Sequence, residues 1–345
     1  MRVAIDIGYG FVKAMNEKGA TIRFPSIVAI DRSTKMRNIL KFQPEDYTVK
    51  IWDKADGAEN VDGRSFLVGD AAMVGGSGIR TWEDKAVENT NLKTLIATAA
   101  ALLGDGEEID LAVGLPLMYY RVQKDDVTQL LRQMDVEVAI EEQLAKKVKI
   151  RSVYVFPQGA GAYYAACLTI DGDVRNPHLV NSPVGLIDIG YRTTDILVMA
   201  KGKKGLMPRE DLSGGIDVGM KHAYHMIQNE VEEVVNKTVD FFAIEKAILW
   251  DNDKFLHRNL EMSLKEYELL AYEELAQQIA AKVKMRWGDE LDSLSAVIIA
   301  GGGGEVLQPY LKLAFPSLIT IENAAFANVE GFLAAQGLSQ RRAKA

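Results

Sequence analysis

The tetrapeptide Asp-Ile-Gly-Tyr occurs twice in this chain, at residues 6–9 and again at residues 188–191. Each copy opens an eight-residue element, DIGYGFVK at 6–13 and DIGYRTTD at 188–195. An apolar run typical of a β-strand leads into each aspartate, and a second strand-like stretch follows each glycine. A carboxylate followed by a glycine turn between two strands can hold a metal ion and phosphates. The repeat therefore predicts a duplicated fold with one nucleotide held between its two halves.

Size and composition narrow the class of protein. At 345 residues the chain is long for one hydrophobic core, so two domains are expected. The net charge of −8 argues against direct nucleic-acid binding by the whole surface. A single cysteine, Cys167, cannot form an internal disulfide and suits a reducing compartment. No apolar stretch is long enough to span a membrane and residues 1–20 lack a signal-peptide pattern, so we expect a cytoplasmic protein without membrane contact.

The order of expected elements predicts an α/β protein with a mixed sheet in each half. Helices are expected at residues 91–103, about 121–133, 157–168, 214–235, 265–287 and 324–336. A polar stretch at about 30–85 predicts an inserted subdomain in the first half, and a second insert is expected at about 213–265. The expected domains are residues 1–168 plus 324–345 for domain I and residues 169–323 for domain II.

The first repeated element has the features of a phosphate loop. Gly8 and Gly10 flank Tyr9, so backbone N–H groups can approach a phosphate without interference from Cβ atoms. Lys13 follows Asp6 by seven residues and can reach the β- and γ-phosphates as a point charge. Taken alone, the same residues also fit a plain β-hairpin. A Walker A loop and a dinucleotide fingerprint are excluded, because both need a helix directly after the glycines.

The second element supplies oxygen ligands instead of a cation. Asp188 and Asp195 enclose Thr193 and Thr194, and hard oxygen ligands of this kind suit a hydrated Mg²⁺. A polar hairpin without a ligand explains this element equally well when it is taken alone. The presence of both elements at corresponding places in the two halves favours the functional interpretation.

Two further segments are candidates for ligand contact. In IIAGGGGEVL, residues 298–307, four glycines lie between a buried strand and a helix, which allows adenosine to lie against the backbone. A tight strand-to-helix turn is the alternative. In FPQGAGAYYAAC, residues 156–167, Pro157 is expected to start a helix with Gln158 in its first turn. There Gln158 can orient an attacking water, or it can simply face solvent.

Taken in order, these segments resemble the actin superfamily, which includes actin, the ATPase domains of heat-shock chaperones and sugar kinases. The resemblance covers essentially the whole chain. In detail it looks like the bacterial and archaeal actin-like proteins of the ParM type, which segregate plasmids. The segments that carry it are DIGYG with Lys13, FPS at 24–26, PQGAGA at 157–162, DIGYRTTD and FANVEGF at 326–332. The resemblance implies an actin-like (ribonuclease H-like, duplicated) two-domain fold with a nucleotide cleft between the domains.

The resemblance also implies roles for individual residues. It assigns catalysis to Gln158, Asp188 and Asp6, and places Asp6 and Asp188 near a Mg²⁺ ion that they hold through water. Residues 323–331 correspond to the second connection between the domains. The nucleotide-binding residues that it implies are Gly8, Tyr9, Gly10, Lys13, Gly190, Arg192, Thr193, Thr194, Asp195, Ser213, Gly214, Gly215, Asp217, Gly301, Gly302, Gly303 and Glu305.

Three functions fit this fold. The first is a filament-forming ATPase that moves plasmid DNA, with Mg²⁺ and ATP (or GTP, since a glycine loop accepts either purine). Its hydrolysis is expected to be slow in the monomer and faster in the filament. Its partners would be further copies of itself and a DNA-binding adaptor at a plasmid centromere. The alternatives are a small-molecule kinase, for which the inserts are short, and a non-enzymatic adaptor, which is expected to carry a membrane-targeting helix.

Overall fold

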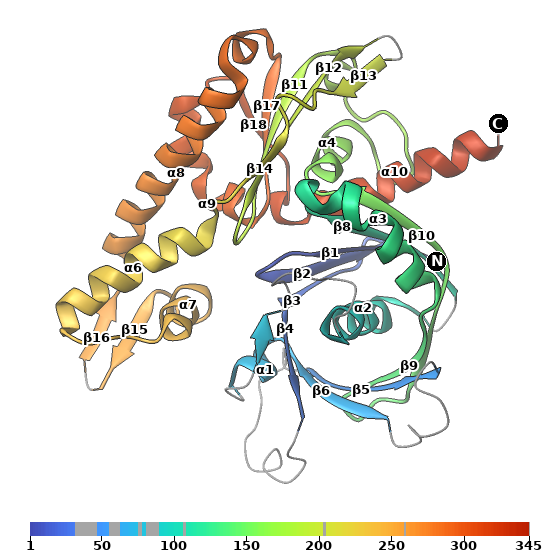
Figure 1. The fold of residues 1–345 in the computed structure, drawn as a ribbon, viewed down its shortest axis with the longest axis horizontal. Helices are drawn as coiled ribbons and strands as arrows, with labels where there is room; N and C mark the ends of the chain where they lie inside the picture. The colour runs from blue at the N-terminus through green and yellow to red at the C-terminus, as the bar shows by residue number, and fades with distance from the viewer. Residues whose placement is uncertain are drawn as a thin grey trace. The chain divides into compact units, whose positions relative to one another are not determined.

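The computed structural model describes residues 1–31, 47–54, 63–74, 78–80, 90–105, 108–202, 205–258 and 260–344 (Figure 1). The chain forms two compact units: unit 1 comprises Met1–Val180 and Phe326–Ala345, and unit 2 comprises Asn181–Ala325. In this division the boundary that the sequence predicted after residue 168 lies inside unit 1. Among the residues that the structure describes, none of the helices combines the length and apolarity needed to cross a lipid bilayer.

Unit 1 is built on a sheet in the order β3-β2-β1-β8-β10-β9-β5-β6-β4-β7. These strands are β1 (Arg2–Ile7), β2 (Phe11–Asn16), β3 (Thr21–Pro25), β4 (Ile27–Ile30), β5 (Tyr47–Asp53), β6 (Arg64–Val68), β7 (Ile79–Arg80), β8 (Glu108–Leu115), β9 (Asp135–Ile140) and β10 (Lys146–Pro157). Strands β1, β8 and β10 are parallel, and their apolar side chains form the centre of the unit 1 core. The described strands of the expected insert join the same sheet, because β5 pairs with β9. The sheet curves around the buried helix α2 (Thr90–Leu103), as Figure 1 shows.

The remaining helices of unit 1 lie outside this curve. They are α1 (Asp70–Val74), α3 (Leu117–Arg132), α4 (Ala160–Cys167) and α10 (Ala327–Lys344), while α5 (Pro177–Asn181) spans the boundary of the units. Helices α4 and α10 cross in direct backbone contact: a Cβ atom added at Gly331 would lie 1.7 Å from the carbonyl oxygen of Gly161. The glycines of the PQGAGA and FANVEGF segments therefore permit this crossing.

The prediction that Pro157 starts a helix is wrong. Pro157 is the last residue of β10, where it pairs with Leu115 of β8, and α4 begins at Ala160. Strand β9 covers β10 only over Lys146–Lys149, so the missing N–H of Pro157 costs no hydrogen bond on that side. Gly159, with φ of 82°, then turns the chain into the helix.

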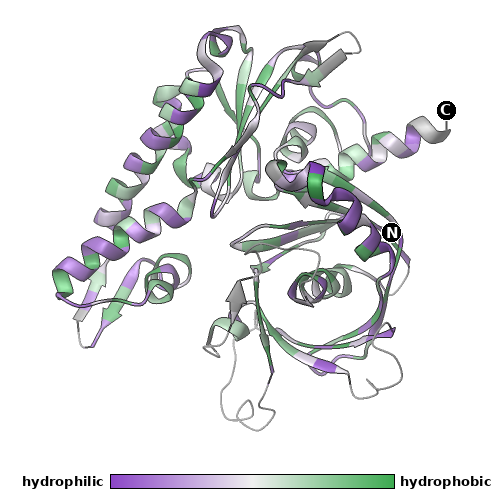
Figure 2. Ribbon diagram, in the orientation of Figure 1, coloured by the Kyte–Doolittle hydropathy of each residue, from purple (hydrophilic) through white to green (hydrophobic). Residues whose placement is uncertain are grey.

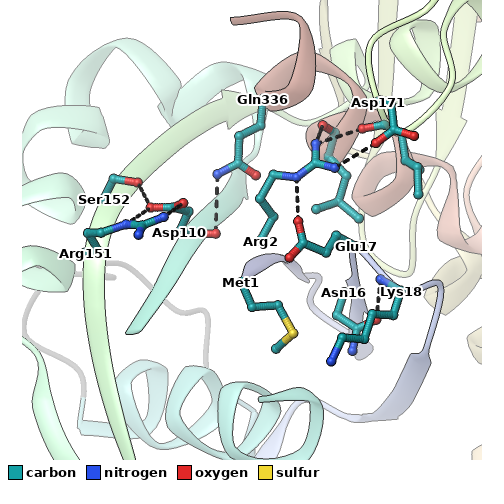
Figure 3. A network of polar contacts seen from close by, with 12 residues as sticks. Met1, Arg2, Asn16, Glu17, Lys18, Asp110, Arg151, Ser152, Asp171 and Gln336 are labelled. Carbon is teal, nitrogen blue, oxygen red and sulfur yellow. Dashed lines mark hydrogen bonds and ion pairs between the residues drawn. The ribbon is translucent and has the colours of Figure 1, made fainter. Parts of the chain in front are cut away.

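A buried arginine ties the segment after α4 to unit 1 (Figure 3). Arg2 in β1 donates to Glu17 Oε2 at 2.9 Å, to the carbonyl oxygen of Ile170 at 2.9 Å and to that of Leu333 at 3.3 Å. Its remaining nitrogen bonds Asp171 at 3.1 Å. These bonds attach residues 170 and 171, which follow α4, to unit 1.

Unit 2 has a smaller sheet in the order β13-β12-β11-β17-β18, with β14 also pairing β12. Its strands are β11 (Val184–Ile189), β12 (Thr194–Gly202), β13 (Gly205–Pro208), β14 (Gly214–Ile216), β17 (Ala296–Ala300) and β18 (Leu318–Thr320), with a separate pair β15 (Lys254–His257) and β16 (Leu260–Ser263). Its helices are α6 (Met220–Val235), α7 (Phe241–Leu249), α8 (Lys265–Trp287) and α9 (Gly302–Ala314). Figure 2 shows the alternation of apolar and polar residues along α8, whose apolar side packs on α6 and α9.

The helix expected over residues 214–235 begins later than predicted. Gly214 to Ile216 form β14 against β12, and α6 starts only at Met220. Glycine is a poor helix former, and Gly214 has a φ of 155°, which a helix does not allow. The start of this segment is therefore a strand that lies beside the second repeated element.

Candidate functional site

The two repeated elements fold into hairpins of the same register. Asp6 pairs with Lys13 across β1–β2, and Asp188 pairs with Asp195 across β11–β12. The turns also match: Gly8 N–H donates to the Phe11 carbonyl at 3.1 Å, and Gly190 N–H donates to the Thr193 carbonyl at 2.9 Å. The predicted strand–turn–strand structure is present in both units.

In unit 1 a serine holds the turn of the hairpin. The Ser26 hydroxyl donates to the Gly8 carbonyl at 2.6 Å, and the Ser26 N–H donates to the Gly10 carbonyl at 2.9 Å. In a trans peptide the next N–H points opposite to the carbonyl, so these two bonds also fix the directions of the Tyr9 and Phe11 N–H groups. The FPS segment thus contributes Ser26 as a support for the turn.

In unit 2 the start of α6 holds the equivalent turn. Met220 N–H donates to the Gly190 carbonyl at 3.1 Å, and Lys221 N–H donates to the Tyr191 carbonyl at 2.7 Å. A Cβ at Gly219 would lie 2.6 Å from the backbone of Arg192, so only glycine allows this approach. The sequence interpretation assigned Gly219 no role, because the helix was expected to start at residue 214 and to include it.

Asp6 is buried at the end of β1 and is held by amides from two distant segments. Gln158 Nε2 donates to Asp6 Oδ1 at 2.6 Å, and the side chain of Asn328 also hydrogen-bonds the Asp6 carboxyl group. Burial raises the pKa of Asp6 above its usual value, although the Lys13 charge and the two amide bonds act in the opposite direction. The structure therefore brings Asp6, Lys13 and Gln158 together as predicted and adds Asn328.

Asn328 lies in the first turn of α10 and is 7% exposed. Its Oδ1 accepts the Gly159 N–H at 3.1 Å and the Ala162 N–H at 3.2 Å, so it caps the start of α4. The sequence interpretation named the surrounding FANVEGF segment as a connection but gave this asparagine no role. The only sequence signal was an asparagine among small and apolar residues, which indicates a buried polar group but not its partner.

In unit 2 the glycine run packs directly on the second hairpin. A Cβ at Gly301 would lie 2.3 Å from the Ile189 carbonyl oxygen and 2.5 Å from Asp188 Oδ1. A Cβ at Gly303 would lie 2.5 Å from the Ile189 side chain. Gly301 follows the last residue of β17, and Gly302 begins α9. The glycine run therefore connects this strand to the helix and forms the first turn of the helix. The glycines thus bring the start of α9 next to the Asp188 carboxylate.

Several predicted binding residues have bonding partners inside the fold. The buried Thr194 donates its hydroxyl proton to the Val218 carbonyl at 2.8 Å. Ser213 Oγ donates to the Arg209 carbonyl at 2.6 Å, and Glu305 Oε1 accepts the Ala325 N–H at 2.9 Å. These three side chains hold neighbouring segments of unit 2 in place.

The remaining predicted residues lie along the same part of unit 2. Arg192 and the exposed Asp217 approach within 3.8 Å. Gly215 of β14 is the direct neighbour of Asp195 in the sheet, so no side chain of β14 stands at that position. Gly214 precedes it, and a Cβ there would lie 2.3 Å from Arg286 Nη1.

The chemistry of the donor set fits a hydrated divalent cation. Asp188 and Asp195 are 7% and 6% exposed and occupy directly opposed positions, so their side chains share one face of the sheet. Two carboxylates that hold Mg²⁺ partly through water are a common arrangement. Within the described residues, no three His, Cys, Asp or Glu side chains gather in a cluster able to hold a metal ion by themselves.

Comparison with known proteins places the chain in a family. Residues 4–161 match the family model of the actin-like protein N-terminal domain, and residues 186–313 match that of the MreB-like C-terminal domain of archaeal actin homologues. An archaeal actin homologue of Thermoplasma acidophilum is 24% identical over 342 residues, which cover 96% of this chain and 97% of the relative.

Solved structures show the same fold over the full length. A protomer of a 15-stranded ParM filament from Clostridium botulinum is 26% identical, with a TM-score of 0.79 and coverage of 98% of this chain and 99% of the other. An archaeal actin homologue solved in complex with ADP is 22% identical, with a TM-score of 0.76 and coverage of 97% and 99%. The predicted actin-like fold is thereby confirmed. This chain belongs to the actin-like proteins, a filament-forming family whose members are generally ATPases.

Proposed function

We propose that this protein is a nucleotide-dependent, filament-forming ATPase that serves plasmid DNA segregation. One Mg²⁺–ATP would use both hairpins, with the β1–β2 turn and the β11–β12 turn as its two phosphate contacts. The observation that carries the proposal is the shared register of these hairpins, in which a lysine faces Asp6 and an aspartate faces Asp188. An ADP complex of a protein with this fold supports nucleotide binding.

The residues opposite Asp6 and Asp188 carry opposite charges, which suggests different tasks for the two hairpins. Lys13 supplies a positive charge for the β- and γ-phosphates, next to backbone N–H groups whose directions Ser26 fixes. Asp188 and Asp195 would hold the hydrated cation. Bound Mg²⁺ offsets the negative charge that develops on the phosphates during transfer to water.

Gln158 is the residue best placed to orient the attacking water. Gln158 Nε2 donates a hydrogen bond to Asp6, so the amide presents Oε1 as an acceptor for a water proton. Asp188 would complete the positioning of that water from the second hairpin. Hydrolysis on such a site depends on positioning and charge stabilisation, and covalent catalysis is not required.

The family and the ParM filament to which this chain is similar support filament formation. We expect polymerisation to accelerate hydrolysis, because assembly favours one of two conformations of the nucleotide-bound protein. A DNA-binding adaptor at a plasmid centromere would link the filament to its cargo.

Electron microscopy of negatively stained protein with and without Mg²⁺–ATP tests the proposal. Filaments that appear only with Mg²⁺–ATP, together with phosphate release, support it. ADP release that depends on an added sugar, without filaments, would instead favour a small-molecule kinase. The variants Asp188→Ala and Gln158→Ala should still bind nucleotide and assemble while phosphate release falls.

A further inference from the structure

We propose that Asn328 is a positioning residue for hydrolysis: it orients the Asp6 carboxyl group, and through Asp6 it orients the Gln158 amide. The inference rests on the proposed ATPase function and adds to it a residue from α10. It is carried by the contacts that the Asn328 side chain makes in unit 1.

The orientation of the Asn328 amide follows from its partners. One atom of the amide receives two backbone N–H groups, those of Gly159 and Ala162, at 3.1 and 3.2 Å. Backbone N–H groups only donate, so this atom is the oxygen and the other is the nitrogen. The hydrogen bond between Asn328 and Asp6 is therefore donated by Asn328 Nδ2 to the carboxyl group.

The orientation of Gln158 follows in turn from Asp6. An ionised carboxylate only accepts hydrogen bonds, so it binds the Nε2 end of Gln158 and directs Oε1 away from itself. If Asp6 were free to rotate or carried a proton toward Gln158, the amide could present either end to the water. Asn328 prevents this by occupying the carboxyl group with a second donor.

The position of Asn328 is fixed by the helix crossing. A Cβ at Gly161 would lie 2.6 Å from the Asn328 carbonyl oxygen, and Gly331 meets the Gly161 carbonyl one turn further along α10. Phe156 and Phe332 stack beside this crossing, with ring centroids 5.5 Å apart. A displacement of α10 against α4 would therefore shift the Asn328 side chain relative to Asp6.

Replacement by aspartate separates positioning from capping. In Asn328→Asp the carboxylate keeps the acceptor for Gly159 and Ala162 at a helix start, where negative charge is favourable. It replaces the donor toward Asp6 by a negatively charged oxygen, so the two carboxylates repel unless they share a proton. A capping role alone leaves hydrolysis unchanged in this variant, whereas a positioning role makes it depend on pH.

The test is phosphate release by full-length Asn328→Asp with Mg²⁺–ATP between about pH 5.5 and 8.5, beside wild type and Asn229→Asp, an exposed change on α6. We expect kcat to fall about 10- to 100-fold at the alkaline end, with recovery toward acid pH, while KM and the sedimented fraction stay within about threefold of wild type. Asn229→Asp should follow the wild-type profile.

A wild-type pH profile of kcat in Asn328→Asp would overturn the inference. If this variant does not fold, Asn328→Ala decides: a lower kcat at unchanged KM supports positioning, and an unchanged kcat overturns it. Failure of the proposed function is distinguishable, because the wild-type protein itself would then release no phosphate.

Discussion

Asp195 lies directly across the β11–β12 pair from Asp188, at the register position that Lys13 holds opposite Asp6 in unit 1. The same backbone turn thus carries a carboxylate beside a cation in one unit and a carboxylate beside a carboxylate in the other. Two negative charges at opposed positions of a sheet repel each other, and a bound cation would remove that repulsion. The duplicated turn therefore has two different electrostatic environments.

Replacing one carboxylate of this pair tests that interpretation. Asp195→Asn should raise the free energy of unfolding by about 0.5 kcal/mol without Mg²⁺, because the repulsion with Asp188 is lost. It should also reduce the stabilisation by Mg²⁺–ATP. Thermal unfolding with and without Mg²⁺–ATP measures both effects. The exposed Asp292→Asn, outside the candidate site, is the control, and equal behaviour of the two variants would contradict the prediction.

Asp6→Asn should stabilise the nucleotide-free protein above acidic pH. The folded-state pKa of Asp6 is raised above 3.8, so the folded protein binds more protons than the unfolded chain in the window just above that value. Stability of the wild type is therefore lost as the pH rises through this window, and the asparagine variant avoids that loss. Melting temperatures between pH 3.5 and 8 should diverge in favour of the variant.

The same variant should lower phosphate release about 100-fold, because it removes the carboxylate that orients Gln158. Lower stability of Asp6→Asn at neutral pH would contradict the burial argument, whatever the activity shows.

Gly331→Ala should destabilise unit 1. The added Cβ would lie 1.7 Å from the Gly161 carbonyl, so α10 and α4 must separate, at a cost of about 1–3 kcal/mol in unfolding free energy. Urea denaturation measures this cost. Ser339→Ala, an exposed change in the same helix, should change the free energy of unfolding by less than about 0.5 kcal/mol. An unchanged free energy of unfolding in Gly331→Ala would show that α4 and α10 do not pack tightly at this crossing.

Glu268 in α8 makes stability depend on pH near neutrality. Burial and the neighbouring Asp253 raise the pKa of Glu268 from 4.5 to about 7. The folded state holds this proton longer than the unfolded chain, so stability falls as the pH rises from 4.5 through 7. Glu268→Gln should therefore raise the melting temperature at pH 8 and leave it nearly unchanged at pH 4. The exposed Glu266→Gln should show no such difference, and an equal response of both variants would contradict the assignment.

Local patterns predicted much of this fold. The hairpins at Asp6 and Asp188, the strand Ala296–Ala300 and the helix Lys265–Trp287 follow from alternation and helical periodicity within short windows. Pro157 was misplaced because proline suits both a helix start and an uncovered strand end, and only the length of β9 decides between them. The start of α6 was predicted too early. Gly214 and Gly215 carry no side-chain pattern, so the sequence did not separate the strand β14 from the helix that follows it.

Sequence motifs singled out candidate site residues that lie close together along the chain, and they gave no role to residues that act from a distance. Asn328 reaches Asp6 from the far end of the chain, and no local pattern records that contact. The family resemblance assigned Thr194 and Glu305 to nucleotide binding, while their bonds to Val218 and Ala325 depend on how other elements pack. Sequence periodicity encodes burial well, but the partner of a buried polar group is set by tertiary structure.

Phosphate release per protomer, measured against protein concentration at saturating Mg²⁺–ATP, tests the central claim most directly. A polymerising ATPase predicts a low rate below a threshold concentration and a clearly higher rate above it, because assembly accelerates hydrolysis. A rate per protomer that is constant over the whole range, or no phosphate release at any concentration, would contradict the account.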